Sequence, residues 1–221
     1  MSKSKRGSDG RRRRRKQNRP LKKSILVVCE GKTEELYFDF VKRQNEIGKR
    51  FSLTVKQAKS GSHLSLADSA LKEKSKLSED RDFDAFWVVM DVEDEHHRES
   101  LQEAIRLLKQ NHFEIALSNP CFEVWYLAHF VKTDKTFLNC NHVITELKTH
   151  WRKEFKSDYD KTRKNNAEQT WKKVDIAIEH ARSIKENQFS EADCVSQCNS
   201  STEVYKILML LCRENNPSKK T

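Results

Sequence analysis

Between residues 24 and 138, hydrophobic residues recur in short runs that alternate with longer amphipathic stretches. The runs are rich in β-branched and aromatic residues, which is typical of strands buried on both faces of a parallel sheet. The stretches between them repeat apolar residues every three or four positions, which predicts helices. The predicted strands are residues 24–29, 51–58, 83–90 and 113–117. The predicted helices are residues 32–44, 63–77, 98–111 and 122–131.

From about residue 139 onward, the chain has no convincing strand pattern. Residues 167–185 predict an amphipathic helix, and a final helix is expected to start at Ser200, because Ser200 and Glu203 have the spacing of a capping box. Strands that alternate with helices predict an α/β fold, with a parallel sheet flanked by helices and right-handed crossovers. We therefore expect three parts: a disordered basic tail (1–23), an α/β core (24–138) and a helical C-terminal extension (139–221).

The positive charge of the chain is concentrated in the predicted tail. The 221 residues carry a net charge of +10, and residues 1–23 hold twelve Lys or Arg against one acid, so the remainder carries −1. We expect the tail to be disordered and to bind nucleic acid in a salt-sensitive, sequence-independent way. The alternatives are docking to an acidic partner and RNA-associated solubility. The cations that we expect to contact phosphates are Arg11, Arg12, Arg13, Arg14, Arg15 and Lys16.

The composition excludes several other classes. No run approaches the roughly 20 apolar residues of a membrane-spanning helix, and no apolar secretory signal follows the basic residues, so we expect a cytoplasmic protein without a membrane partner. The six cysteines lack paired metal-ligand spacing, which favours reduced thiols over a zinc site. No GxxxxGK[ST] loop is present, so we do not expect the chain to hydrolyse ATP.

Acidic residues follow three of the predicted strands. Glu30 ends the first strand, Asp91 ends the third, and Glu123 lies shortly after the fourth. Because the carboxyl ends of parallel strands meet at one edge of a sheet, these side chains should share a pocket. Grouped carboxylates repel each other unless a cation joins them, and oxygen ligands favour Mg²⁺ or Mn²⁺. Gly31, directly after Glu30, is expected to permit a sharp strand-to-helix turn.

Further acids extend this predicted metal site, each with an alternative. Glu34 lies one helical turn beyond Glu30, either as a ligand or as an acid that favours a helix N-terminus. After Asp91, Glu93 would share its side of a continuing strand, whereas Asp94 would approach if the chain turned at once. The spacing leaves the choice between Glu93 and Asp94 open.

Aromatic residues at helical spacing follow the fourth predicted strand. They are expected to pack in the core, and the alternative is a platform on which bases stack. His129, at the end of the same helix, is expected to be a structural imidazole, with a catalytic role as the alternative. The aromatic residues concerned are Phe122, Trp125, Tyr126 and Phe130.

Five segments together resemble one family. The segments are VVCEGKTE, FWVVMDVEDEH, IALSNPCFEVWYLAHF, the YDK at residues 159–161, and NSSTEVYKIL near the C-terminus. They are similar to the RloB family, also called AbiLii-like, which comprises small Toprim-like proteins of bacterial and archaeal defence loci. The resemblance covers residues 24–211 and extends to the basic tail. It implies a Toprim-like sheet and Mg²⁺-dependent phosphodiester chemistry.

The resemblance also implies roles for individual residues. Glu30 would be a general acid/base or a metal ligand, and Asp91 a metal ligand. The family commonly has Asp-x-Asp where this chain has Asp91-Val92-Glu93, which leaves the identity of the second ligand open. Lys161 would neutralise charge on a phosphate, although a solvated lysine in a charged stretch is the alternative. OLD-type nucleases share the Toprim pattern. Three further residues match positions in these OLD-like relatives: Glu34, Ser118 and Glu123.

These expectations combine into one functional hypothesis and one alternative. We expect a metal-dependent Toprim-type nuclease that cleaves RNA, with tRNA as one candidate, or DNA in anti-phage defence by abortive infection. Relatives often work beside an ABC- or AAA-type ATPase, which implies such a partner here. The alternative is a noncatalytic nucleic-acid-binding subunit of a defence complex.

Overall fold

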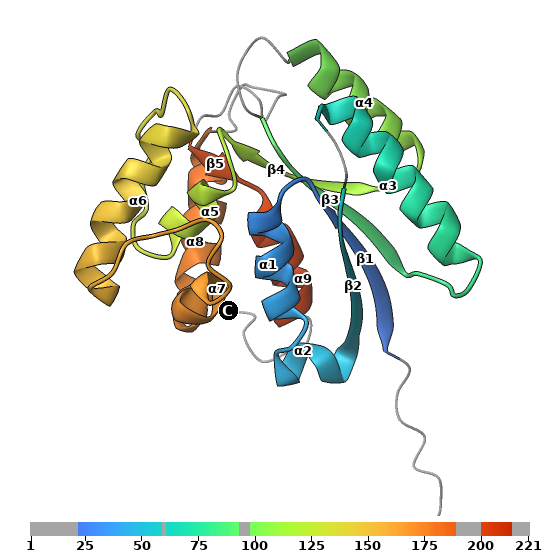
Figure 1. Cartoon of the computed structure of the whole chain (residues 1–221), viewed down its shortest axis with the longest axis horizontal. Coiled ribbons are helices and arrows are strands. Elements are labelled where there is room, and N and C mark those ends of the chain that lie inside the picture. Colours follow the sequence, from blue (N-terminus) through green and yellow to red (C-terminus); the bar gives the residue numbers. More distant parts are fainter. Residues whose placement is uncertain (1–21, 59–60, 93–97, 189–199, 214–221) are drawn as a thin grey trace, which may run out of the picture.

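The protein folds around a single, mostly parallel sheet. The computed structural model describes residues 22–58, 61–92, 98–188 and 200–213. The strand order is β2-β1-β3-β4-β5, with β1 to β4 parallel and β5 antiparallel to β4 (Figure 1). The predicted α/β class with a parallel sheet is thereby confirmed. The strands are β1 (Lys23–Cys29), β2 (Phe51–Gln57), β3 (Ala85–Asp91), β4 (Glu114–Asn119) and β5 (Ser201–Thr202).

Helices cover both faces of the sheet. The described helices are α1 (Lys32–Val41), α2 (Asn45–Arg50), α3 (His63–Ser78), α4 (Arg98–Gln110), α5 (Glu123–Ala128), α6 (Cys140–Phe155), α7 (Asn166–Thr170), the 3₁₀ helix η2 (Trp171–Lys173), α8 (Val174–Gln188) and α9 (Val204–Arg213). None of these helices combines the length and the hydropathy needed to cross a bilayer.

Alternating side chains of the central strands feed two separate cores. Leu26 and Val28 of β1 pack in the layer under α3 and α4. Ile25 and Val27 of the same strand point to the opposite face, where α1, α5, α8 and α9 lie (Figure 1). Because each strand is covered on both faces, its sequence reads as a continuous hydrophobic run, which is why the four parallel strands were predictable.

The N-terminal half differs from the prediction at element ends. Strand β1 begins at Lys23, a residue that the sequence assigned to the tail, and Lys23 pairs with Phe51 of β2. The helix predicted for residues 32–44 ends at Val41, and Gln44, in an extended conformation, precedes the separate helix α2. Helix α5 covers only Glu123–Ala128 of the predicted 122–131. Residues 1–21, with the arginine run, lie outside the described residues.

The C-terminal half contains a strand that the sequence analysis missed. The predicted capping box is wrong, because Ser200 has a positive φ of 65°, and the next two residues form β5. Helix α9 begins only at Val204, whose N–H donates to Thr202 Oγ1 (3.3 Å). Helix α6 was not predicted at all. The single helix predicted for residues 167–185 is instead divided into α7, η2 and α8.

The predicted C-terminal extension shares a core with the preceding part of the chain. Leu147 of α6, Ile178 of α8 and Leu208 of α9 belong to the same hydrophobic cluster as Ile25 and Val27 of β1. The division at residue 138 stays a prediction about sequence organisation. In the fold, residues from both sides of that position bury each other.

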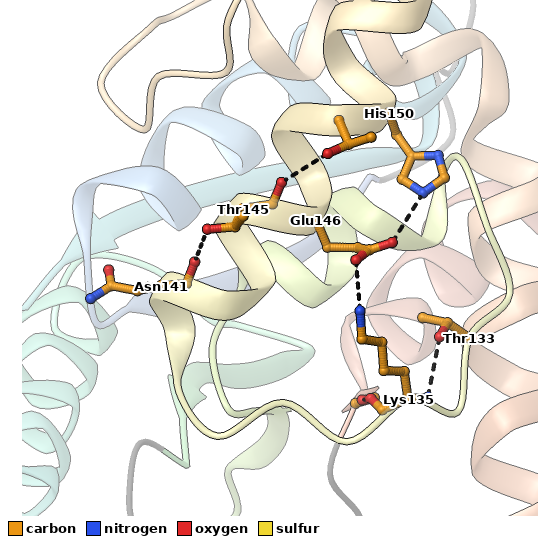
Figure 2. A network of polar contacts seen from close by, with 8 residues as sticks. Thr133, Lys135, Asn141, Thr145, Glu146 and His150 are labelled. Carbon is orange, nitrogen blue, oxygen red and sulfur yellow. Dashed lines mark hydrogen bonds and ion pairs between the residues drawn. The ribbon is translucent and has the colours of Figure 1, made fainter.

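Polar contacts fasten α6 to the segment that precedes it. Lys135 Nζ donates to Glu146 Oε2 (2.9 Å), and His150 Nε2 lies 3.7 Å from Glu146 Oε1 (Figure 2). The hydrogen bond from Lys135 is the largest cause of the lowered pKa of Glu146. These contacts connect the segment before α6 with the middle of the helix.

Candidate metal and phosphate site

Two of the predicted acids meet at the ends of adjacent strands. Glu30 directly follows β1, and Asp91 is the last residue of β3. The Asp91 N–H donates to Glu30 Oε2 (2.9 Å), and the Glu30 N–H donates to Val89 O (3.1 Å). The backbone carbonyl of Asp91 accepts a hydrogen bond from Nε2 of the buried His63 (3.0 Å) at the start of α3. Strand pairing and His63 therefore fix the Asp91 backbone.

Glu34 joins them from the first turn of α1 and is only 4% exposed. A Cβ atom at Gly31 would lie 2.7 Å from Glu34 Oε2. Gly31 itself has φ −117° and ψ 177°, an extended conformation that any residue adopts. The chain does turn from β1 to α1 within two residues, as expected, but the turn does not need the conformational freedom of glycine. The absent side chain instead leaves room for the Glu34 carboxylate.

Glu123 and Lys161 complete the cluster from the other side. Glu123, the first residue of α5, is 2% exposed and accepts a hydrogen bond at Oε1 from Tyr159 Oη (3.2 Å). Lys161 Nζ lies 3.3 Å from the same oxygen, while its side chain remains 48% exposed. Lys161 thus contacts a buried acid at one end and solvent along its length.

Mutual electrostatic effects show that these residues form one group. The pKa of Glu34 is raised to about 7, mainly by burial and in addition by the charges of Glu123 and Glu30. Burial likewise raises the pKa of Asp91 well above its ordinary value, followed by the effects of Glu34, Glu30 and Glu123. Lys161 opposes both shifts. We call Glu30, Glu34, Asp91 and Glu123 the acid cluster.

The acid cluster has the chemistry of a divalent-cation site. Glu34 Oε2 and Asp91 Oδ1 are buried and have no hydrogen-bond partner among the described residues. A buried carboxylate oxygen without a hydrogen-bond donor destabilises the fold, and a cation that coordinates this oxygen would offset the cost. The ligands on offer are all carboxylate oxygens, which suit Mg²⁺ or Mn²⁺. The types of ligand therefore suit the predicted metal, which stays a prediction.

Some predicted site residues lie elsewhere or outside the described part of the chain. Glu93 and Asp94 fall within residues 93–97, which the structure does not describe, so the choice between them stays open. Ser118 is buried, and its hydroxyl lies 2.9 Å from Thr202 Oγ1 of β5. This hydroxyl therefore links two strands. The roles of all site residues in chemistry stay predictions.

Two cysteines next to the site contradict the expectation of reduced thiols. Cys121 and Cys140 form a disulfide across 19 residues, with their Cα atoms 5.5 Å apart. The pairing follows from the fold, because α5 and α6 pack against each other and bring their first turns together. Within the described residues, Cys29 and Cys212 take part in no disulfide. Sequence spacing gave no sign of the pair.

The aromatic residues after β4 pack in the core, as predicted. Phe122, Trp125 and Tyr126 are each at most 1% exposed, which rules them out as a stacking platform in this structure. The buried His129 bonds to the Trp125 carbonyl through Nδ1 (2.9 Å), which agrees with a structural role. The sequence singled out Tyr159 only as part of the YDK segment, and its contact with Glu123 depends on tertiary structure that no spacing reveals.

Comparison with known proteins supports the family assignment. A search of curated proteins found no match to this chain. The family model described as RloB-like protein matches residues 25–211, from β1 to α9, and so includes every member of the acid cluster and Lys161. The chain belongs to the RloB-like protein family.

Proposed function

We propose that this protein is a Mg²⁺- or Mn²⁺-dependent nuclease of the Toprim type, which cleaves RNA, with tRNA as one candidate, or DNA in anti-phage defence. The observation that carries the proposal is the acid cluster, in which two buried carboxylate oxygens lack donors while an exposed lysine contacts the same group. Membership in the RloB-like family supports the defence role.

Each residue of the cluster has a task in this proposal. Glu34 and Asp91 offer oxygens to the cation, and Glu30 either joins them or moves a proton at its carboxylate. The cation, when bound, would polarise the phosphate and activate a water. Lys161 reaches a phosphate oxygen from the solvent side, and Glu123 with Tyr159 orients its ammonium group.

The surface beside Lys161 suits a polyanionic substrate. Lys156, Arg163 and Lys164 are exposed within the same loop as Lys161, residues 156–164, where they outnumber the exposed Asp158 and Asp160. Exposed cations at a site edge raise the local concentration of phosphates and accelerate their encounter. The predicted basic tail would add to this attraction. A nucleic-acid backbone is therefore a better candidate substrate than a small neutral metabolite.

We also propose a cytoplasmic location and an ABC- or AAA-type ATPase as partner. Both extend the resemblance to defence systems in which such an ATPase accompanies the protein. A partner that hydrolyses ATP would explain how a chain without a phosphate-binding GxxxxGK[ST] loop responds to a signal.

The test is cleavage of a nucleic-acid panel by the full-length chain, alone and with any ATPase encoded beside it. Glu30→Gln and Asp91→Asn should each lower cleavage about 100-fold or more, because a neutral amide weakens cation binding without creating a cavity. Asp68→Asn, on the exposed face of α3, is the matched control and should cleave normally. EDTA should abolish cleavage by all variants that show it.

Two outcomes would redirect the proposal. Undiminished cleavage by Asp91→Asn would contradict the assignment of the acid cluster. Tight binding of nucleic acid without cleavage under any metal, with and without the ATPase, would favour the noncatalytic binding subunit. Comparing Glu93→Gln with Asp94→Asn in the same assay would identify the second ligand.

A further inference from the structure

The disulfide lies against the acid cluster. Cys121 precedes α5 by two residues, and Cys140 is the first residue of α6. Cys140 Sγ lies 3.2 Å from Glu123 Oε2 and 3.6 Å from Lys161 Nζ. One sulfur therefore touches both the buried acid and the lysine that the proposed function places in the site.

The two sulfurs differ in their exposure to solvent and in the charges around them. Cys121 is buried at 3% exposure, whereas Cys140 is partly exposed. Cys140 also lies at the N-terminus of a 16-residue helix and next to the Lys161 ammonium group. Both features stabilise negative charge on sulfur, and the thiolate is the reactive form of cysteine, whereas the Glu123 carboxylate, 3.2 Å from the same sulfur, opposes that charge. The difference in exposure therefore decides which sulfur a reagent reaches. Reagents from solvent should therefore react first at Cys140.

We propose that Cys140 is a thiol-modification site, that Cys121 is its resolving cysteine, and that a low-molecular-weight disulfide such as oxidised glutathione is the oxidant. The Cys140 thiolate attacks one sulfur of the reagent, forms a mixed disulfide and releases one thiolate. Cys121 then loses its proton to solvent, attacks Cys140 Sγ and releases the second. Two protein thiols are oxidised, and one reagent disulfide is reduced to two thiols.

Modification at Cys140 changes what Glu123 contacts. In the dithiol state, the Cys140 S–H is placed to donate to Glu123 Oε2, beside the donors Tyr159 and Lys161 at Oε1. A disulfide sulfur has no hydrogen to donate, so this partner is lost on oxidation. Lys161 is then held more strongly by Glu123 and is less available to a phosphate. Oxidation should therefore lower the activity of the site, an effect that rests on the proposed function.

An alternative to the redox reaction is that the two cysteines and Glu123 bind a metal ion. Ligand atoms of Cys121, Glu123 and Cys140 all lie within 4.8 Å of one another. The ammonium group of Lys161, however, already contacts Cys140 Sγ and Glu123 Oε1, and its positive charge repels a cation there. A redox reaction is therefore the better explanation of the paired sulfurs.

The experiment equilibrates the full-length chain in glutathione buffers of different ratios and maps the linked peptides by mass spectrometry. Oxidising buffer should produce the 121–140 link, and Cys121→Ser should instead accumulate glutathione on Cys140. Lys161→Met should slow modification of Cys140 about threefold or more, because it removes the adjacent positive charge. This readout does not depend on any nuclease activity.

Cleavage provides the second readout. Wild-type cleavage should fall about fivefold or more in oxidising buffer and recover with a dithiol. Cys140→Ser should lose this response, whereas Cys212→Ser should keep it. Preferential modification of another cysteine, or protection of Cys140 by Zn²⁺ at stoichiometric concentration, would overturn the site. Equal cleavage by the fully linked and fully reduced chain would overturn its coupling to activity. Absence of cleavage in every form would contradict the proposed function, while peptide mapping would still decide the modification site.

Discussion

At the scale of single residues, His129 shows how burial determines the energetic cost of a proton. Its Nδ1 donates to the Trp125 carbonyl, and its Nε2 is buried without a hydrogen-bond partner among the described residues. The rings of Trp125 and Tyr126 lie 5.0 and 6.2 Å away. Protonation at Nε2 would place a charge in this apolar surrounding, so burial lowers the pKa of His129 to about 4.

The consequence is a specific loss of stability in mild acid. Between pH 6.5 and 4, the unfolded chain binds a proton at this imidazole and the folded chain does not, so the free energy of unfolding decreases as the pH falls. At about 1.4 kcal/mol per pH unit, the contribution of His129 should decrease by roughly 2 kcal/mol between pH 7 and pH 5. His129→Asn keeps a donor for the Trp125 carbonyl but cannot titrate.

Urea unfolding at both pH values measures this effect as the difference between wild type and His129→Asn. The difference should shift by the amount given, in favour of the variant at low pH. The exposed His142, near the start of α6, supplies the control, and His142→Asn should follow the wild-type profile. Parallel pH profiles for wild type and His129→Asn would contradict the account of a neutral buried imidazole.

The sequence predicted which site residues lie together where their positions at strand ends determine the geometry. Glu30 and Asp91 end buried parallel strands, so their proximity followed from the sheet alone. Lys161 and Tyr159 reach Glu123 from a loop more than 30 residues away, and only the resemblance pointed to Lys161. Cys121 and Cys140 meet because α5 and α6 pack together, and no local pattern encodes that contact.

At the scale of elements, Glu203 joins the sheet to the last helices. Its N–H donates to Leu117 O of β4 (2.7 Å), and its Oε2 accepts from Leu117 N (3.4 Å). Its Oε1 lies 3.4 Å from Lys185 Nζ of α8 and 2.6 Å from Lys206 Nζ of α9. One buried carboxylate thus connects β4, α8 and α9.

Neutralising this carboxylate should destabilise the fold. Glu203→Gln keeps the shape of the side chain but removes the charge that the buried Lys185 faces, and breaking a buried ion pair costs about 3 kcal/mol. Chemical denaturation at neutral pH measures the loss. The control is Glu46→Gln, which breaks an exposed pair with Lys49 and should change stability little. Equal effects of the two substitutions would show that Glu203 has no special role.

Strand β5 shows why the C-terminal half of the chain was harder to predict than the N-terminal half. Strand β5 has only two residues, too few for any alternating pattern, and it exists because Ser201 and Thr202 pair with β4. The Ser200–Glu203 spacing resembled a helix start, but strand pairing prevailed over that local preference. Predicted elements in the parallel sheet, by contrast, were long enough for their periodicity to be decisive.

At the scale of the whole molecule, charge divides the chain into two unequal parts. Residues 1–23 carry +11, and the remaining residues carry −1. The described acid cluster lies entirely within the nearly neutral part. We therefore expect nucleic-acid affinity and chemistry to be separable, with affinity depending on the tail and chemistry on the carboxylates.

Deletion of residues 1–19 tests this separation. The deletion removes ten of the twelve basic side chains of residues 1–23, so nonspecific affinity should fall. The slope of log affinity against log salt should flatten by about 0.7 to 0.9 for each phosphate that the shortened chain no longer neutralises. Fluorescence anisotropy with a labelled oligonucleotide at several salt concentrations measures both. An unchanged slope would instead point to a protein partner for the tail, and loss of turnover at saturating substrate would contradict the separation.

We propose that the acid cluster binds a divalent cation, and electron paramagnetic resonance of Mn²⁺ measures such binding without any substrate. Free Mn²⁺ gives a signal that bound Mn²⁺ does not, so titration of the full-length chain yields an affinity without any assumption about substrate. We predict saturable binding that Mg²⁺ competes for, weakened about tenfold or more by Asp91→Asn and unchanged by Asp68→Asn. Equal Mn²⁺ affinities for these two variants, or no saturable binding by the wild-type chain, would show that the acid cluster is not a cation site.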